Sequence, residues 1–80
     1  MNNNTTFLLN GAVSELDNLE CGEKFLVKDL FKGYVWKRLS ISARLNLGTL
    51  FVNYAKNNPE KVIILDKTSS NQQMYKKSKS

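Results

Sequence analysis

The chain of 80 residues contains no histidine, a single cysteine and a single proline, and each shortage excludes a class of protein. Without histidine it lacks the commonest general base and a frequent zinc ligand. No Gly-rich phosphate motif is present, and the acids offer no catalytic pair, since Asp29 and Asp66 each adjoin a lysine. We therefore expect no enzyme, no metal and no cofactor. One cysteine, Cys21, excludes an internal disulfide and fits a reducing compartment.

Long apolar runs are missing as well. None approaches the roughly 20 residues that a membrane-spanning helix needs. The start, MNNNTTFLLN, has no positive charge ahead of its short apolar patch, which does not fit a signal peptide. These features predict a cytoplasmic protein that does not contact membranes, and the length predicts a single small domain.

The stretch from Tyr34 to Lys56 carries the only tryptophan, both arginines and the longest helical apolar pattern. It predicts a helix over about 42–56, with Ser40 or Ser42 as the N-cap, preceded by a shorter helix at 35–39. Two helices joined by a tight turn form a helix-turn-helix candidate. The apolar side chains that recur on one face of the longer helix are Ala43, Leu47, Leu50, Phe51 and Tyr54.

Ahead of this helix pair, the chain predicts short elements. Residues 1–13 are polar and Asn-rich, and we expect them to be flexible. Ser14 to Asp17 has the spacing of a capping box, which predicts a turn or two of helix ending at Gly22. A strand at 23–27 and a short helix at 28–33, ended by Gly33, follow.

After the long helix, the β-branched run at 61–65 predicts a strand, and 72–77 predicts a return strand across a polar turn. The hairpin should pair with the first strand as a small antiparallel sheet. This order of elements predicts an α+β fold, namely a small winged helix-turn-helix domain over 14–77 with a C-terminal β-hairpin wing. Residues 78–80 would form a tail.

Charge is divided unevenly along the chain. Residues 1–31 hold two lysines and five acids, a net charge of −3, whereas residues 32–80 hold ten Lys or Arg and two acids, a net charge of +8. An asymmetric basic surplus is typical of proteins that bind polyanions, because neutralised phosphates release counterions. The alternative is a solvated face that serves solubility.

Three segments together resemble a known family: LECGEKFLVKDLFKGYVWKRL, RLNLGTLFVNY and KTSSNQQMYKK. In this order and spacing they are similar to the DUF1413-like proteins, a small uncharacterised-domain family of Gram-positive bacteria and their mobile elements. The resemblance includes the single-stranded DNA-binding protein of staphylococcal cassette chromosomes, and it implies a winged helix that binds single strands in replication or transfer of a mobile element. Replication proteins of the same element would then be possible partners. Leu26 and Val27 stand where the family often has a Thr cap.

Binding a single strand without sequence preference requires a positive groove for phosphates and planar groups on which bases stack. Large aromatic side chains in a domain this small are usually core residues. For Tyr34 and Tyr75 a core position and an accessible position are about equally favoured, and Tyr75 lies in the most basic segment. The candidate nucleic-acid-binding residues are Lys37, Arg38, Arg44, Lys67, Tyr75, Lys76 and Lys77.

Two other functions stay open. A duplex-binding winged-helix regulator would read bases with Arg44 and Asn53, but the same helix face carries Leu45, Gly48 and Val52. Gly48 suggests close packing against another backbone. A protein-interaction adaptor would use its basic surface for an acidic partner. The partly apolar helix face would also suit a homodimer contact or a docking site.

Overall fold

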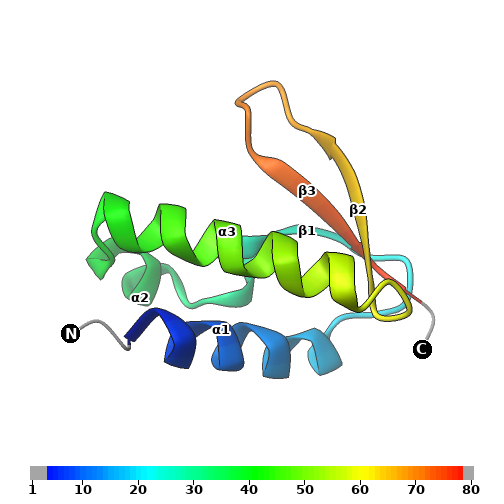
Figure 1. Cartoon of the computed structure of the whole chain (residues 1–80), viewed down its shortest axis with the longest axis horizontal. Coiled ribbons are helices and arrows are strands. Elements are labelled where there is room, and N and C mark those ends of the chain that lie inside the picture. The colour runs from blue at the N-terminus through cyan, green and yellow to red at the C-terminus, as the bar shows by residue number, and fades with distance from the viewer. Residues whose placement is uncertain (1–3, 79–80) are drawn as a thin grey trace.

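Three α-helices form one side of the molecule in a computed structural model that describes residues 4–78 (Figure 1). Helix α1 (Asn4–Glu15) and the longest helix, α3 (Ile41–Asn57), lie side by side. The short helix α2 (Gly33–Arg38) lies at the end where α3 begins. Two short 3₁₀ helices, Leu16–Asn18 and Val27–Leu30, flank the first strand.

The sheet has three antiparallel strands in the order β1-β3-β2. The strands are β1 (Lys24–Leu26), β2 (Val62–Lys67) and β3 (Gln73–Lys77). Tyr75 of the central strand lies opposite Phe25 on one side and Ile64 on the other. The predicted hairpin, its pairing with the first strand and the α+β class are therefore confirmed.

Helix α3 begins and ends close to the predicted residues. The Oγ atom of Ser40 accepts a hydrogen bond of 3.1 Å from the backbone N–H of Ala43. This bond satisfies a donor that would otherwise be unpaired in the first turn, so Ser40 rather than Ser42 is the N-cap. At the other end, the side-chain amide of Asn58 donates to the carbonyl oxygen of Tyr54 at 2.8 Å.

The N-terminal prediction is wrong over most of its length. Helix α1 begins at Asn4, ten residues before the predicted start, and Ser14 lies in its last turn instead of capping it. Ala12 is fully buried and Leu9 packs against the core. Burial of this face against α3 outweighs the weak helix propensity of an Asn- and Thr-rich segment. Residues 1–3, and the end of the predicted tail at 79–80, lie outside the described residues.

The segment after β1 also differs from its prediction. A single 3₁₀ turn (Val27–Leu30) replaces the helix expected at 28–33, and Gly33 is the first residue of α2. The carboxylate of Asp29 accepts a hydrogen bond of 2.9 Å from the backbone N–H of Leu26. This bond joins Asp29 to the residue that precedes the turn, so the turn forms although the side chain of Leu26 does not cap it.

The core lies between α1, α3 and the inner face of the sheet. Three aromatic rings form its centre: Phe25 and Tyr75 stack with centroids 5.7 Å apart, and Phe51 meets Tyr75 edge-on at 4.9 Å. Such contacts stabilise a core beyond the burial of area alone. The other buried hydrophobic residues are Ala12, Leu16, Leu30, Leu47, Ala55 and Val62.

Candidate functional site

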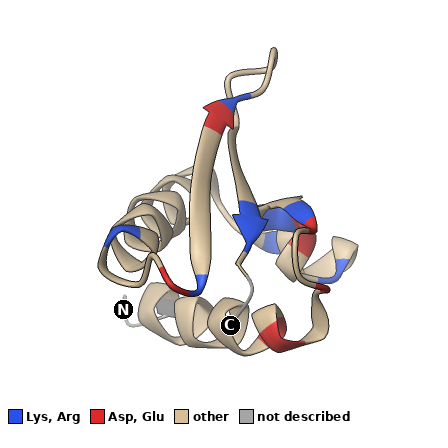
Figure 2. Cartoon of the chain, turned by 90° about the vertical axis from the view of Figure 1, so that its right-hand side faces the viewer, with Lys and Arg blue, Asp and Glu red and all other residues tan. Residues whose placement is uncertain are grey.

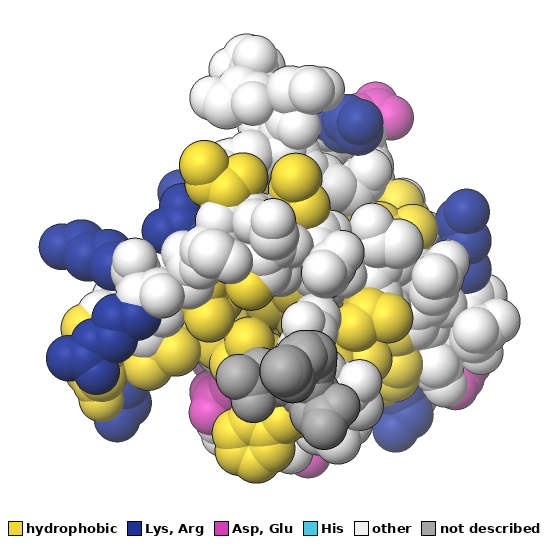
Figure 3. Space-filling model, turned by 60° about the vertical axis from the view of Figure 1, so that its left-hand side comes forward, with side chains coloured by type: hydrophobic (Ala, Val, Ile, Leu, Met, Phe, Trp, Pro, Cys, Tyr) yellow, Lys and Arg dark blue, Asp and Glu magenta, His cyan; other side chains and the backbone are white. Residues whose placement is uncertain are grey.

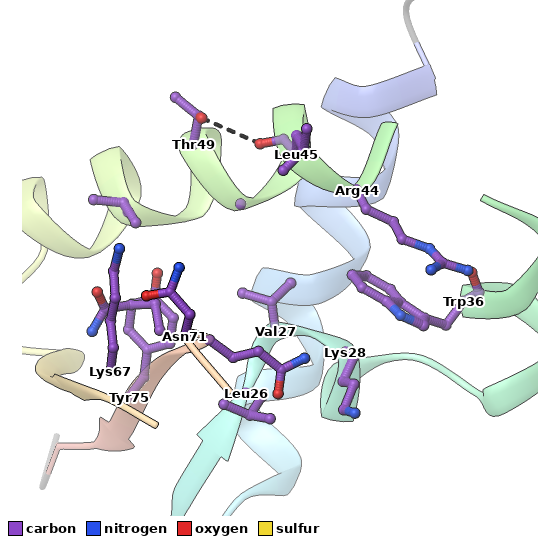
Figure 4. Close-up of a pocket in the computed structure, with 14 residues that line it drawn as sticks. Leu26, Val27, Lys28, Trp36, Arg44, Leu45, Thr49, Lys67, Asn71 and Tyr75 are labelled. Carbon is purple, nitrogen blue, oxygen red and sulfur yellow. Dashed lines mark hydrogen bonds between the residues drawn. The ribbon is translucent and has the colours of Figure 1, made fainter. Parts of the chain in front are cut away.

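A groove of about 380 Å³ runs between helix α3 and the β2–β3 hairpin (Figure 4). We call it the α3–hairpin groove. Helix α3 forms one wall, the hairpin forms the other, and the segment after β1 and the side chain of Trp36 complete it. Its lining residues are Leu26, Val27, Lys28, Trp36, Arg44, Leu45, Gly48, Thr49, Val52, Lys67, Asn71, Gln72, Gln73 and Tyr75.

Arg44 and Trp36 form a planar pair at one end of the groove (Figure 4). The guanidinium carbon of Arg44 lies 5.3 Å from the centroid of the indole, which is a cation–π contact. A terminal N–H of Arg44 donates to the carbonyl oxygen of Trp36 at 3.1 Å. The buried Nε of Arg44 has no hydrogen-bond partner among the described residues. The pair thus holds a positive charge in a fixed position at this end of the groove.

The groove is positively charged. Lys28, Arg44 and Lys67 line it, and no Asp or Glu is among its described lining residues. Arg44 belongs to a stretch of the chain, residues 30–59, that contains no acid at all. The opposite end of the molecule, which faces the viewer in Figure 2, carries Asp and Glu together with Lys and Arg. The described lining of the groove therefore carries cations only, although Asp29 and Asp66 adjoin Lys28 and Lys67 in the chain.

Gly48 leaves open space in the helical wall of the groove. A methyl group added at this position would find no atom within 4 Å, so the prediction that Gly48 permits close packing of another backbone is wrong. Glycine inside a helix costs about 1 kcal/mol relative to alanine. Because no packing contact in the described chain accounts for this cost, the open space is available to a ligand.

The tip of the hairpin is held by local hydrogen bonds. The hydroxyl of Thr68 accepts from the backbone N–H groups of Ser70 and Gln72, each at 3.2 Å. Asn71 adopts a positive φ of 67°, which asparagine tolerates better than most residues. The side-chain amide of Gln73 donates to the carbonyl oxygen of Leu65. The second wall of the groove is thus fixed by its own backbone and side-chain contacts.

The predicted binding residues do not form one site. Arg44 and Lys67 line the groove, whereas Lys37 and Arg38 lie in the last turn of α2. The Arg38 guanidinium lies 5.3 Å from the ring centroid of Tyr34, which is itself 55% exposed. This second cation–aromatic pair gives α2 an accessible stacking plane of its own.

The two lysines of β3, Lys76 and Lys77, have different surroundings. Lys76 follows the buried Tyr75 in an extended strand, so it points to the opposite face of the sheet. The ammonium of Lys77 donates to the carbonyl oxygens of Leu16 at 2.6 Å and Leu19 at 3.3 Å. Lys77 therefore ties the end of β3 to the segment after α1, and its charge is engaged within the protein.

Tyr75 cannot serve as an accessible stacking residue, so this part of the predicted site is wrong. Its side chain is fully buried between Phe25 and Phe51, because it occupies the inner face of the central strand. The hydroxyl has no hydrogen-bond partner among the described residues. Burial raises the pKa of Tyr75 from 10.0 to about 12, since desolvation disfavours the phenolate.

Sequence reasoning omitted several residues that the groove brings together. Lys28, Trp36 and the hairpin amides of Asn71 and Gln72 all line it. The expectation that large aromatic side chains lie in the core does not hold for Trp36, and a tryptophan eight residues before an arginine across a tight turn is a usable signal. Nothing in the local pattern indicates that Lys28 lies beside a hairpin more than 35 residues further along the chain.

No helix within residues 4–78 is long and apolar enough to cross a membrane.

In comparisons with known proteins, no curated protein and no solved structure matches this chain. One family model does match, over residues 10–77, and its description is "domain of unknown function (DUF1413)". This match covers most of the chain and agrees with the family indicated by the sequence resemblance. The protein therefore belongs to the DUF1413 family.

Proposed function

We propose that this protein binds single-stranded DNA with little sequence preference, and that the strand lies in the α3–hairpin groove. The observation that carries the proposal is the composition of the groove. Lys28, Arg44 and Lys67 line it with no carboxylate among the described lining residues, and Arg44 is held against the indole of Trp36. Cations that follow a phosphate backbone, combined with planar groups, are what sequence-tolerant single-strand binding requires.

The composition of α3 argues against reading of duplex DNA. A helix that reads the major groove presents Arg, Asn or Gln to base edges. Here the groove-facing side of α3 carries Leu45, Gly48 and Val52, and the hydroxyl of Thr49 donates to the carbonyl oxygen of Leu45 at 3.2 Å. This side offers few free polar groups for base recognition. It does offer space for the backbone of a single strand beside Gly48.

Helix α2 would extend the path of the strand beyond the groove. Tyr34 is exposed and stacked by Arg38, so a base can approach the outer face of the ring. Stacking of one base on an aromatic side chain contributes about 1–3 kcal/mol. We extend the proposal from what the sequence resemblance implies, namely a role in replication or transfer of a mobile element of Gram-positive bacteria. In this proposal the fold acts as a winged helix used for single strands, with replication proteins of the element as partners.

The test is fluorescence anisotropy with a labelled single strand of mixed sequence, competed by unlabelled single strand and by the matching duplex. We expect the single strand to compete much better. Lys28→Ala and Lys67→Ala should each weaken binding, because each variant loses about one phosphate contact. The slope of the logarithm of the binding constant against the logarithm of the salt concentration should then decrease by roughly 0.7. Lys56→Ala is the matched control, because Lys56 is exposed on α3 but does not line the groove.

Two results would contradict the proposal. Equal competition by duplex would show that the protein does not discriminate between the two forms of DNA. An equal loss of affinity in the Lys56→Ala variant would show that total charge, and not the α3–hairpin groove, governs binding.

A further inference from the structure

Two aliphatic side chains at the start of α3 are highly exposed, and the α3–hairpin groove does not account for this exposure. Ile41 is 73% exposed and Leu45 is 68% exposed. They are four residues apart on one helix, so they lie on the same face. Leu45 borders the α3–hairpin groove, whereas Ile41 does not line it. Aliphatic side chains offer a nucleic acid neither a stacking plane nor a hydrogen-bond donor, so strand binding does not account for them.

This apolar patch, defined as Ile41 and Leu45, has cationic neighbours. Lys37 and Arg38 end α2 immediately before the turn into α3, and Arg44 precedes Leu45. No acid occurs between residues 30 and 59. In Figure 3, which brings this end of the molecule forward, hydrophobic side chains are spread over the face, Lys and Arg gather at its left edge, and further Lys and Arg with some Asp and Glu lie at other margins. A surface of this kind is complementary to a ligand that is both apolar and negatively charged.

We infer that the patch docks an acidic amphipathic segment of a partner protein. Apolar side chains of that segment would cover Ile41 and Leu45, while its carboxylates would face Lys37, Arg38 and Arg44. Recognition of an amphipathic segment by spaced apolar anchors is a common mode of peptide binding. The charged rim would raise the association rate and select acidic partners. The inference does not rest on strand binding, although Leu45, Arg44 and Arg38 also belong to the proposed path of the strand.

A second copy of the chain fits the patch less well than a separate partner. The acids of this protein are concentrated between Glu15 and Asp29. The aliphatic side chains that accompany them are turned inward, because Leu16 is 3% exposed and Leu19 packs against the core. The described chain between Glu15 and Asp29 therefore presents no face that is both acidic and apolar.

The test uses a fluorescein-labelled synthetic peptide that places Leu or Phe at every third or fourth position and Asp or Glu elsewhere. Its control replaces each Leu and Phe by Ser and keeps the charge. We expect the intact protein to bind the first peptide and bind the control at least about tenfold more weakly, a difference of about 1.4 kcal/mol. The Ile41→Gln/Leu45→Gln double variant should lose affinity for the first peptide by a similar factor.

Phe7→Ser is the matched control variant, because Phe7 is 76% exposed on α1, outside the patch, and its loss should leave peptide binding unchanged. Ile41→Gln alone, outside the groove, should leave affinity for the single strand unchanged, which separates this inference from the proposed function. No binding of the peptide, or equal binding of both peptides, would overturn the inference. It would also be overturned if Ile41→Gln weakened strand binding as much as peptide binding, or dissociated a dimer of the protein.

Discussion

Replacing Tyr75 with phenylalanine tests whether this residue is a core residue or a contact for nucleic acid. The buried hydroxyl has no hydrogen-bond partner among the described residues. A buried polar group without a partner costs about 1–3 kcal/mol, whereas the ring keeps its contacts with Phe25 and Phe51 in the variant. We therefore expect Tyr75→Phe to be as stable as the original protein or more stable by about 1 kcal/mol. That gain would raise Tm by about 4–8 °C for a domain of this size.

Tyr75→Ala gives the contrasting result. Removal of a large aromatic side chain from a core costs about 3–5 kcal/mol. The free energy of unfolding of a typical 80-residue domain is on the order of 4–12 kcal/mol, so this variant should lose much of its stability. Both variants are compared by urea and thermal unfolding, and the binding of single-stranded DNA is measured only where the variant is folded.

The pH dependence of stability gives an independent check. Burial raises the pKa of Tyr75 from 10.0 to about 12 in the folded protein. Because this pKa is higher in the folded than in the unfolded chain, the folded protein keeps its full stability below pH 10 and loses stability as the pH rises towards 12, where the unfolded chain ionises the phenol more readily. Tyr75→Phe lacks this loss, so its advantage over the original protein should widen across that interval.

Two outcomes would refute the reasoning on Tyr75. A single hydrogen bond contributes about 1 kcal/mol. If Tyr75→Phe is less stable than the original protein by that amount or more, the hydroxyl has a partner in solution. If Tyr75→Phe is fully folded but loses affinity for the single strand, the hydroxyl contacts DNA and the residue is not purely a core residue.

Three further predictions each follow from one local feature of the structure. Lys77→Met removes the ammonium that donates to two carbonyl oxygens after α1, so urea unfolding should show a loss of about 1.5–3 kcal/mol, while Lys76→Met should change stability little. Ser40→Ala removes the N-cap of α3 and should cost about 1 kcal/mol, whereas equal costs for Ser40→Ala and Ser42→Ala would contradict the observed cap. Gly48→Ala should raise stability by about 0.8–1 kcal/mol, because alanine favours a helix more than glycine does. The same variant should weaken strand binding, because its methyl group enters open space in the groove, and unchanged affinity would place the strand elsewhere.

Local sequence patterns determined most of the secondary structure. The helical spacing of Leu47 and Phe51 and the dense β-branched run from Val62 predicted α3 and β2, because hydrophobic periodicity reflects which face an element buries. The polar turn after Lys67 predicted the hairpin. The positive charge beyond residue 31 was also legible, since it depends on composition alone.

Tertiary contacts decided the remaining features. Helix α1 exists from Asn4 because α3 covers its apolar face, and no local signal in an Asn-rich segment carries that information. The register of β3 turned Tyr75 into the core and Lys76 away from it, although both lie in the same basic segment. The candidate site itself joins Lys28, Arg44 and Lys67 from three separate parts of the chain. The sequence alone thus determined α3, the hairpin and the sign of the charge. Only the packing of helices against the sheet determined which of those charges face a common groove, because that depends on contacts between residues far apart in the chain.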